Sequence, residues 1–219
     1  MKKELIFWNV DTQKDFMYPN GKLPVADALS IVENLGYVTN VAKNNMFRVV
    51  NTRDWHAKED AEISDNPDYI TTYNEHCMAD TDGAEYIPET APLNPYVVGK
   101  KKENLKGLLN SLNIVLNKDK FDVFSGNANA YDVVRLLNPQ AVVVYGVATN
   151  VCVNHAVLEL TQQVPEVYVI TNAIKHLPHL EDSYHPLYNS ARKTIEAWKN
   201  AGAKMIRTFD LENIVGQYK

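Results

Sequence analysis

The chain has 219 residues, of which 45% are hydrophobic and 22% charged, which are ordinary values for a globular protein, and one α/β domain over residues 1–219 is expected. Its net charge of −5 argues against nucleic-acid or membrane partners. Two cysteines are too few for a secreted disulfide framework, and no run of 18 or more apolar residues predicts a membrane span. Because the first residues also lack the features of a signal peptide, we expect a cytoplasmic location.

Short apolar runs alternate along the chain with segments of helical periodicity. Strands are predicted at residues 5–10, 46–51, 113–116, 141–147, 167–171 and 204–207. Helices are predicted at residues 26–43, 131–137, 151–161 and 185–201. Strands that are almost continuously apolar are typical of a parallel sheet that is covered on both faces. Right-handed crossovers then give a three-layer α/β/α sandwich with a mostly parallel sheet.

A long polar stretch, from about residue 54 to 96, interrupts this alternation. It is rich in Asp, contains Pro, and is too long for an ordinary connection between elements. Excursions of this length often form lids or binding loops, so we expect this one to contribute to a functional site.

Reactive side chains follow the predicted strands. Asp11 follows the first strand, Asp54 and His56 follow the second, and Lys118 follows the third. Cys152 comes after the strand at 141–147 and a short Gly-Val-Ala-Thr-Asn turn. Because ligands bind beyond the carboxyl ends of parallel strands, these side chains should meet at one edge of the sheet.

Cys152 falls in the first turn of a predicted helix, with Thr149 or Asn150 as its cap. A helix N-terminus lowers the pKa of a thiol, and its free N–H groups can hold an oxyanion. The alternative is a buried, inert cysteine, which is common for this residue type. The nearby carboxylate of Asp11 and amine of Lys118 favour the nucleophile.

Asp11 and Lys118 each have a functional and a plain interpretation. Asp11 can take the proton of the thiol and later protonate leaving ammonia, or it can form a turn or helix cap, a role for which Asp15 is the stronger candidate. Lys118 can stabilise both the carboxylate and the thiolate. It can also be a solvated lysine, and Lys120 is then its competitor.

The sequence Asp54-Trp55-His56 places a carboxylate and an imidazole two residues apart, on the same side of an extended chain. With His76 as a third ligand, this set suits one divalent transition metal, such as zinc, iron or manganese. A short Asp-x-His also arises by chance, so a plain structural role stays open. Cys77 could be a fourth ligand, although a structural role is favoured for it.

Three motifs, at residues 11–16, 118–124 and 146–153, resemble those of the isochorismatase-like cysteine hydrolases, and within them the nicotinamidases. The resemblance implies that Asp11 is the base, that Lys118 rather than Lys120 is the catalytic lysine, and that Cys152 is the nucleophile. It also implies a cis peptide between Val147 and Ala148, and an oxyanion hole formed by the backbone N–H groups of Ala148 and Cys152.

The same resemblance makes Asp54, His56 and His76 the metal ligands. Two departures lie near the expected pocket, because the related enzymes usually have Trp-Pro before the His-Cys pair and Asp-Tyr before the nucleophile. This chain has Tyr-Asn-Glu at residues 73–75 and Asn-Val at residues 150–151. They leave the cysteine chemistry intact and bear on the identity of the amide.

The resemblance implies a nicotinamidase of pyridine nucleotide biosynthesis, which converts nicotinamide to nicotinate and ammonia through a thioester. The ring is then expected against Phe16 and Trp55, with no organic cofactor and with a small-molecule amide as the partner. Oligomers are common in this family, so a homo-oligomer is compatible with the resemblance. The nearest alternative is a metal-free relative that acts on another amide, carbamoyl or ureido substrate.

Two other classes of function make different predictions. A nucleotide-binding or redox protein should carry Gly-x-Gly-x-x-Gly after the first strand, where this chain has Asp-Thr-Gln-Lys-Asp-Phe. An interaction domain should have lost the catalytic residues, yet all three candidates are present. Isochorismatase activity itself is disfavoured because those enzymes cleave a vinyl ether without a cysteine nucleophile.

Overall fold

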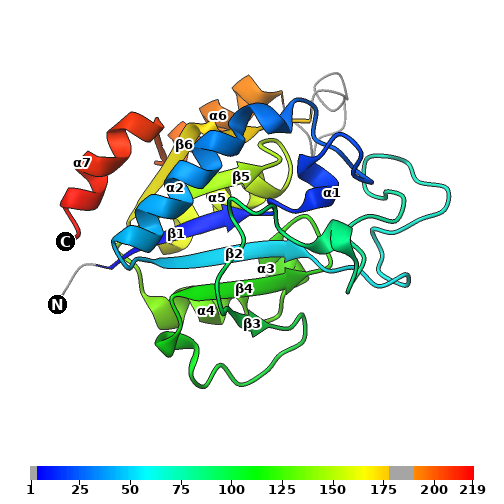
Figure 1. The fold of residues 1–219 in the computed structure, drawn as a ribbon, viewed down its shortest axis with the longest axis horizontal. Helices are drawn as coiled ribbons and strands as arrows, with labels where there is room; N and C mark the ends of the chain where they lie inside the picture. The colour runs from blue at the N-terminus through cyan, green and yellow to red at the C-terminus, as the bar shows by residue number, and fades with distance from the viewer. Residues whose placement is uncertain (1–3, 178–189) are drawn as a thin grey trace.

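A seven-stranded sheet forms the middle layer of the computed structural model, which describes residues 4–177 and 190–219 (Figure 1). The strand order is β3-β4-β2-β1-β5-β6-β7, and every neighbouring pair is parallel. The strands are β1 (Leu5–Val10), β2 (Arg48–Asp54), β3 (Tyr96–Val98), β4 (Asn113–Lys118), β5 (Ala141–Val147), β6 (Glu166–Lys175) and β7 (Lys204–Ile206).

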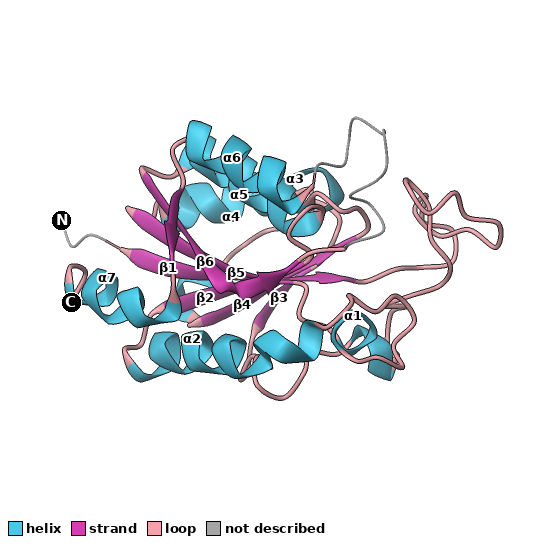
Figure 2. Cartoon of the chain, turned by 90° about the horizontal axis from the view of Figure 1, so that it is seen from above, coloured by secondary structure: helices cyan, strands magenta, loops and turns pink. Residues whose placement is uncertain are grey.

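Helices cover both faces of the sheet (Figure 2). One face carries α1, α2 and α7, and the other carries α3, α4, α5 and α6. The helices are α1 (Lys14–Met17), α2 (Val32–Asn44), α3 (Val123–Gly126), α4 (Ala130–Leu137), α5 (Cys152–Gln163), α6 (Ala191–Asn200) and α7 (Leu211–Gly216). No helix in the described ranges is both long and apolar enough to cross a bilayer.

The core follows from the composition of the strands. All seven residues of β5 and all six of β1 are buried, because helices pack on both faces of these central strands. From one side, α2 contributes Leu35, Val38 and Val41, which recur at helical spacing. From the other side, α5 contributes a second apolar stripe, which includes Val153, Val157 and Leu160.

The predicted fold class is confirmed, and the differences are local. The second strand begins at Arg48 rather than at residue 46, because Met46 has a positive φ of 55° and belongs to the turn that ends α2. A 3-10 turn at Ala28–Ile31 precedes α2, so the regular helix starts later than predicted. The sequence analysis missed β3, a three-residue edge strand. The start of the helix predicted at 185–201 lies outside the described residues.

The sheet places its functional edge between β1 and β5. From β1 the chain builds outward on one side through β2 and β4, and it later places β5 on the other side of β1. Such a reversal of direction leaves a crevice beyond the carboxyl ends of the two strands. Asp11 follows β1 there and the turn leading to Cys152 follows β5, at the end of the molecule opposite the termini (Figure 1).

Gly146 is required where β5 passes the end of β1. Its φ is +124°, and a Cβ added to it would lie 2.1 Å from the carbonyl oxygen of Val10. We therefore predict that Gly146→Ala lowers the free energy of unfolding by about 2 kcal/mol or more. The measurement is denaturant unfolding, with Gly216→Ala as the control, because nothing lies within 4 Å of an added Cβ there. Equal stability of the two variants would contradict this account.

Candidate active site

Lys118 is the centre of a buried group that contains the three predicted catalytic residues. Its Nζ lies 2.9 Å from Oδ2 of Asp11 and 3.7 Å from Sγ of Cys152, and it forms an ion pair with Asp54. Lys118 and Asp11 are fully buried, and Cys152 is only 7% exposed. The structure thus brings together an acid, an amine and a thiol from three separate strand ends.

The ends of the strands hold these side chains in place. Lys118 and Asp54 are the last residues of β4 and β2 and are paired in register, so their side chains lie next to each other. Asp11 follows β1 with a positive φ of 47°. The backbone N–H of Asp11 donates to the backbone carbonyl of Thr52. The side-chain hydroxyl of Thr52 donates in turn to Oδ1 of Asp11 over 2.6 Å. Nothing in the sequence pattern singled out Thr52.

The charges of this group are mutually dependent. Burial disfavours the charge on Lys118, but Asp11 and Asp54 outweigh it and raise the pKa of the lysine well above its ordinary value. Burial likewise opposes ionisation of Asp54, and the charge of Lys118 outweighs it, so that the pKa of Asp54 lies well below its ordinary value. Lys118 is therefore a permanent cation between carboxylates.

The expectation that the helix start lowers the pKa of Cys152 is wrong in direction. Burial raises the pKa of this thiol well above its ordinary value, which Lys118 only partly offsets and which Asp11 and Asp54 increase. The resting thiol is therefore protonated and needs a base. Burial also raises the pKa of Asp11, and this makes its carboxylate a stronger proton acceptor than an ordinary aspartate.

The turn before Cys152 has the geometry that the motif implied. The peptide between Val147 and Ala148 is cis. Within the described residues, the N–H groups of Ala148 and Cys152 donate to no backbone carbonyl, so both are open to a ligand. The cap of α5 is Val151, without a side-chain hydrogen bond, rather than Thr149 or Asn150.

Asp54, His56 and His76 form a second buried group, directly beside the first. One ligand atom from each lies within 4.8 Å of the others. Oδ2 of Asp54 lies 3.7 Å from Nε2 of His56 and 3.8 Å from Nε2 of His76. The ring of His76 is oriented by its Nδ1–H, which donates to the carbonyl of Asn74 over 2.8 Å, so that Nε2 presents a lone pair.

These residues fit a transition metal. Nε2 of His56 is buried and has no hydrogen-bond partner in the described part of the chain, which is costly unless a cation binds it. Its other nitrogen, Nδ1, lies 3.4 Å from a carboxylate oxygen of Asp60. Two imidazoles and one carboxylate are a ligand set that suits zinc, iron or manganese.

The side chain of Gln13 holds the backbone of Asp54 in place through hydrogen bonds. Its side-chain oxygen accepts the N–H of Asp54 over 2.7 Å, and its side-chain nitrogen donates to the carbonyls of Asp54 and Ala84, each over 2.8 Å. Asp15 anchors the loop that carries His76, since its carboxylate accepts the N–H of Cys77. The thiol of Cys77 is fully buried and lies outside the metal-ligand group, in accord with a structural role.

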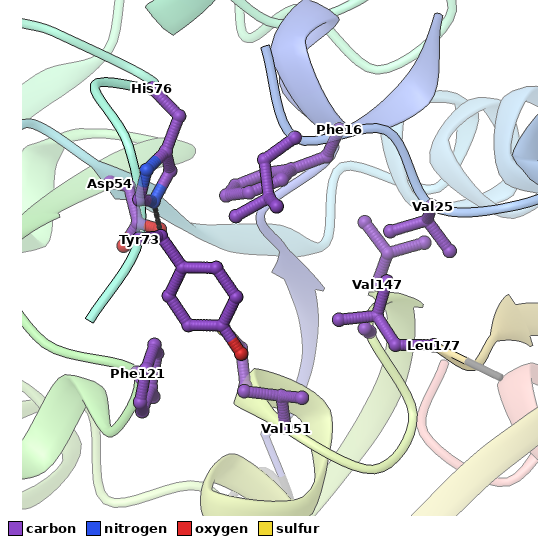
Figure 3. A pocket seen from close by; sticks show the side chains of 12 residues that line it. Phe16, Val25, Asp54, Tyr73, His76, Phe121, Val147, Val151 and Leu177 are labelled. Atoms are coloured by element: carbon purple, nitrogen blue, oxygen red, sulfur yellow. Dashed lines mark ion pairs between the residues drawn. The ribbon is translucent and has the colours of Figure 1, made fainter. Parts of the chain in front are cut away.

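A narrow pocket leads to the thiol (Figure 3). Its cavity volume is about 30 Å³. Its walls are Phe16, Leu23, Val25, Asp54, Tyr73, His76, Phe121, Val147, Ala148, Val151, Cys152 and Leu177. Phe16 lines it as predicted, and Tyr73 and Phe121, which pack edge to face, form the opposite side. Residues 73–75 were expected near the pocket and Phe121 lies within the motif at residues 118–124, but neither Tyr73 nor Phe121 was assigned to the pocket wall. Nothing in the sequence pattern singled out Leu177.

Trp55 was expected against the substrate, but it is not among the residues that line the pocket. The guanidinium of Arg53 lies over the ring of Trp55, with its Cζ 3.7 Å from the ring centroid. The reason is the alternation of an extended chain, in which the residue between Asp54 and His56 points the opposite way.

The fold and this buried group together are those of an α/β enzyme with its site at the switch point of the sheet. The isochorismatase domain family matches residues 5–208, and the chain belongs to that family. It is thus an isochorismatase-family hydrolase. No curated protein matches the chain significantly.

Several solved structures share the fold. The pyrazinamidase of Pyrococcus horikoshii, in complex with zinc, has 23% identity and a TM-score of 0.70, over 93% of this chain and 99% of that one. The nicotinamidase/pyrazinamidase of Bacillus subtilis has 20% identity and a TM-score of 0.69, over 93% and 100%. The N-carbamoylsarcosine amidase of Thermoplasma acidophilum has 20% identity and a TM-score of 0.67, over 94% and 96%.

The metal group leads to a direct binding prediction. We expect the purified, chelator-treated protein to bind one zinc ion, and we expect His76→Ala to weaken that binding by more than about 100-fold, since loss of even an outer partner costs about 10- to 100-fold. Calorimetric titration with zinc measures this. His155→Ala is the control, because His155 lies outside the ligand group. Unchanged affinity in His76→Ala would rule out the assigned ligand set.

Proposed function

We propose that this chain is a metal-dependent cysteine amidohydrolase that converts nicotinamide to nicotinate and ammonia. The observation that supports this most is that Asp54 and His76, two members of the metal-ligand group, line a narrow, mostly apolar pocket that Cys152 also lines. The narrow shape and apolar walls of this pocket suit a flat aromatic ring, with a ring nitrogen toward the metal-ligand group and the carboxamide toward the thiol.

In the first half of the proposed reaction, Asp11 takes the proton of Cys152 as sulfur attacks the amide carbon. The oxyanion is held by the N–H groups of Ala148 and Cys152, and Lys118 balances the negative charge. The C–N bond then breaks, and Asp11 returns its proton to the leaving nitrogen, so that ammonia and a thioester form.

In the second half, water attacks the thioester while Asp11 accepts a proton from it. The C–S bond breaks, the proton returns to sulfur, and the carboxylic acid leaves. Asp54, His56 and His76 would hold a divalent metal, which when bound supplies a Lewis acid for the ring nitrogen and so orients the amide.

The pocket favours an uncharged substrate. Its described lining is apolar apart from Asp54, His76 and the hydroxyl of Tyr73, and no Arg or Lys is part of it. A substrate carboxylate would lose its hydration there without gaining a cation. The likeness to a carbamoylsarcosine amidase supports a second candidate, a carbamoyl or ureido hydrolase that works without a metal. If such a substrate carries a carboxylate, the described pocket offers no cationic side chain to pair with it.

We further infer a cytoplasmic role in pyridine nucleotide biosynthesis.

Removal of the nucleophile is the first test of this function. We predict that Cys152→Ala lowers ammonia release from nicotinamide by at least about 1,000-fold, because no other side chain in the site can form the thioester. Ammonia release from nicotinamide, pyrazinamide and several ureido compounds, with and without chelator, measures it.

Cys77→Ala is the matched control and should keep activity, since the thiol of Cys77 belongs neither to the pocket lining nor to the metal-ligand group. Wild-type rates in Cys152→Ala would overturn the mechanism. Turnover of ureido compounds alone, insensitive to chelator, would favour the second candidate.

The acid limb of the pH profile reports on Asp11. The base must be deprotonated to act, so activity is lost as the pH falls through its pKa. Because burial raises that pKa from the ordinary value of 3.8, the midpoint in kcat/KM should lie above 3.8. Initial rates against pH, with circular dichroism to verify folding at each point, measure it. A midpoint at or below 3.8 would exclude Asp11 as the base.

A further inference from the structure

The ladder between β5 and β6 continues beyond the end of β5 through a side chain. Val147 is paired with Lys175, and the N–H of Thr149 donates to the carbonyl of Lys175 over 2.7 Å. At the next position the amide of Asn150 replaces the backbone. Its Nδ2 donates to the carbonyl of Leu177 over 3.1 Å, and its Oδ1 accepts the N–H of Leu177 over 2.9 Å.

This reciprocal pair joins two parts of the pocket wall. Val151 and Cys152 follow Asn150 directly, and both line the pocket together with Leu177. Figure 3 shows Val151 and Leu177 at separate places on the pocket wall. Asn150 is 1% exposed and Leu177 is 6% exposed, so water cannot easily replace either hydrogen bond. The two bonds therefore fix the distance between the nucleophile turn and Leu177.

Only an amide can make both bonds. A carboxylate at this position could accept the N–H of Leu177 but could not donate to its carbonyl, and it would place two acceptors against each other.

We propose that Asn150 is a positioning residue that sets the width of the substrate pocket by holding Leu177 against the nucleophile turn. This proposal rests on the proposed function for the identity of the substrate, which is a flat, uncharged aromatic amide. Asn150 is not among the residues that line the pocket, so it acts through Leu177 and Val151, which are.

The experiment compares Asn150→Asp and Asn150→Ala with Asn154→Asp. Asn154 is the matched control, because within the described ranges its side chain forms one hydrogen bond, in which its oxygen accepts the indole N–H of Trp198, and an Asp retains that acceptor. Steady-state kinetics are measured for nicotinamide with the zinc-loaded protein. We expect both variants at residue 150 to raise KM by about 10-fold, with kcat changed by less than about 3-fold, as for loss of a buried hydrogen bond that shapes the binding pocket. Asn154→Asp should match the wild type.

Alkylation of the thiol tests the same idea without a substrate. The rate ratio for N-phenyl iodoacetamide over iodoacetamide should rise by about 3-fold or more in both variants, because a loosened wall admits the larger reagent. An unchanged KM and an unchanged ratio in Asn150→Ala would overturn the proposal. A shift in Asn150→Asp alone would also overturn it, since that result would report the added charge. If the wild type hydrolyses no aromatic amide, the proposed function fails, and the alkylation ratio still decides the role of Asn150.

Discussion

The ion pairs of Lys118 with Asp11 and Asp54 are the interaction on which the site depends. Three fully buried charges at one sheet edge would be unstable singly, because desolvation of each costs several kcal/mol. Together they carry one positive and two negative charges, and the lysine reaches both carboxylates and the thiol. Removal of the lysine would leave two carboxylates facing each other in a dry interior.

The same lysine connects two functions that the sequence presents separately. Asp54 uses one oxygen for Lys118 and the other for His56 and His76, so the catalytic group and the metal-ligand group share a residue. Charge at the metal-ligand group therefore influences the proton affinity of Asp11 through Lys118. This coupling gives a physical reason for the register of β2 and β4, which places Asp54 directly beside Lys118.

Much of the fold could be predicted from the sequence, because strands buried on both faces are almost wholly apolar. The bounds of β1 and β5 agree with the prediction, whereas the edge strand β3 has three residues and no apolar run to reveal it. Asp11, Asp54, His56, Lys118 and Cys152 could be predicted because they lie at or just after strand ends, and the topology brings strand ends together. His76 lies in the long loop, and its assignment depended on the resemblance. The pocket wall could be predicted only in part, since Tyr73, Phe121 and Leu177 come from separate loops. The protonated state of Cys152 also depends on burial, which the helix-start argument ignored.

The most direct test of the role of Lys118 is the protonation of the buried carboxylates. Infrared difference spectroscopy of the zinc-loaded protein at neutral pH, with Asp11→Asn to assign the band, can be compared between the wild type and Lys118→Met. We predict that Asp11 is ionised in the wild type and takes up a proton when the lysine charge is removed. An ionised Asp11 in both proteins would contradict the central role given to Lys118.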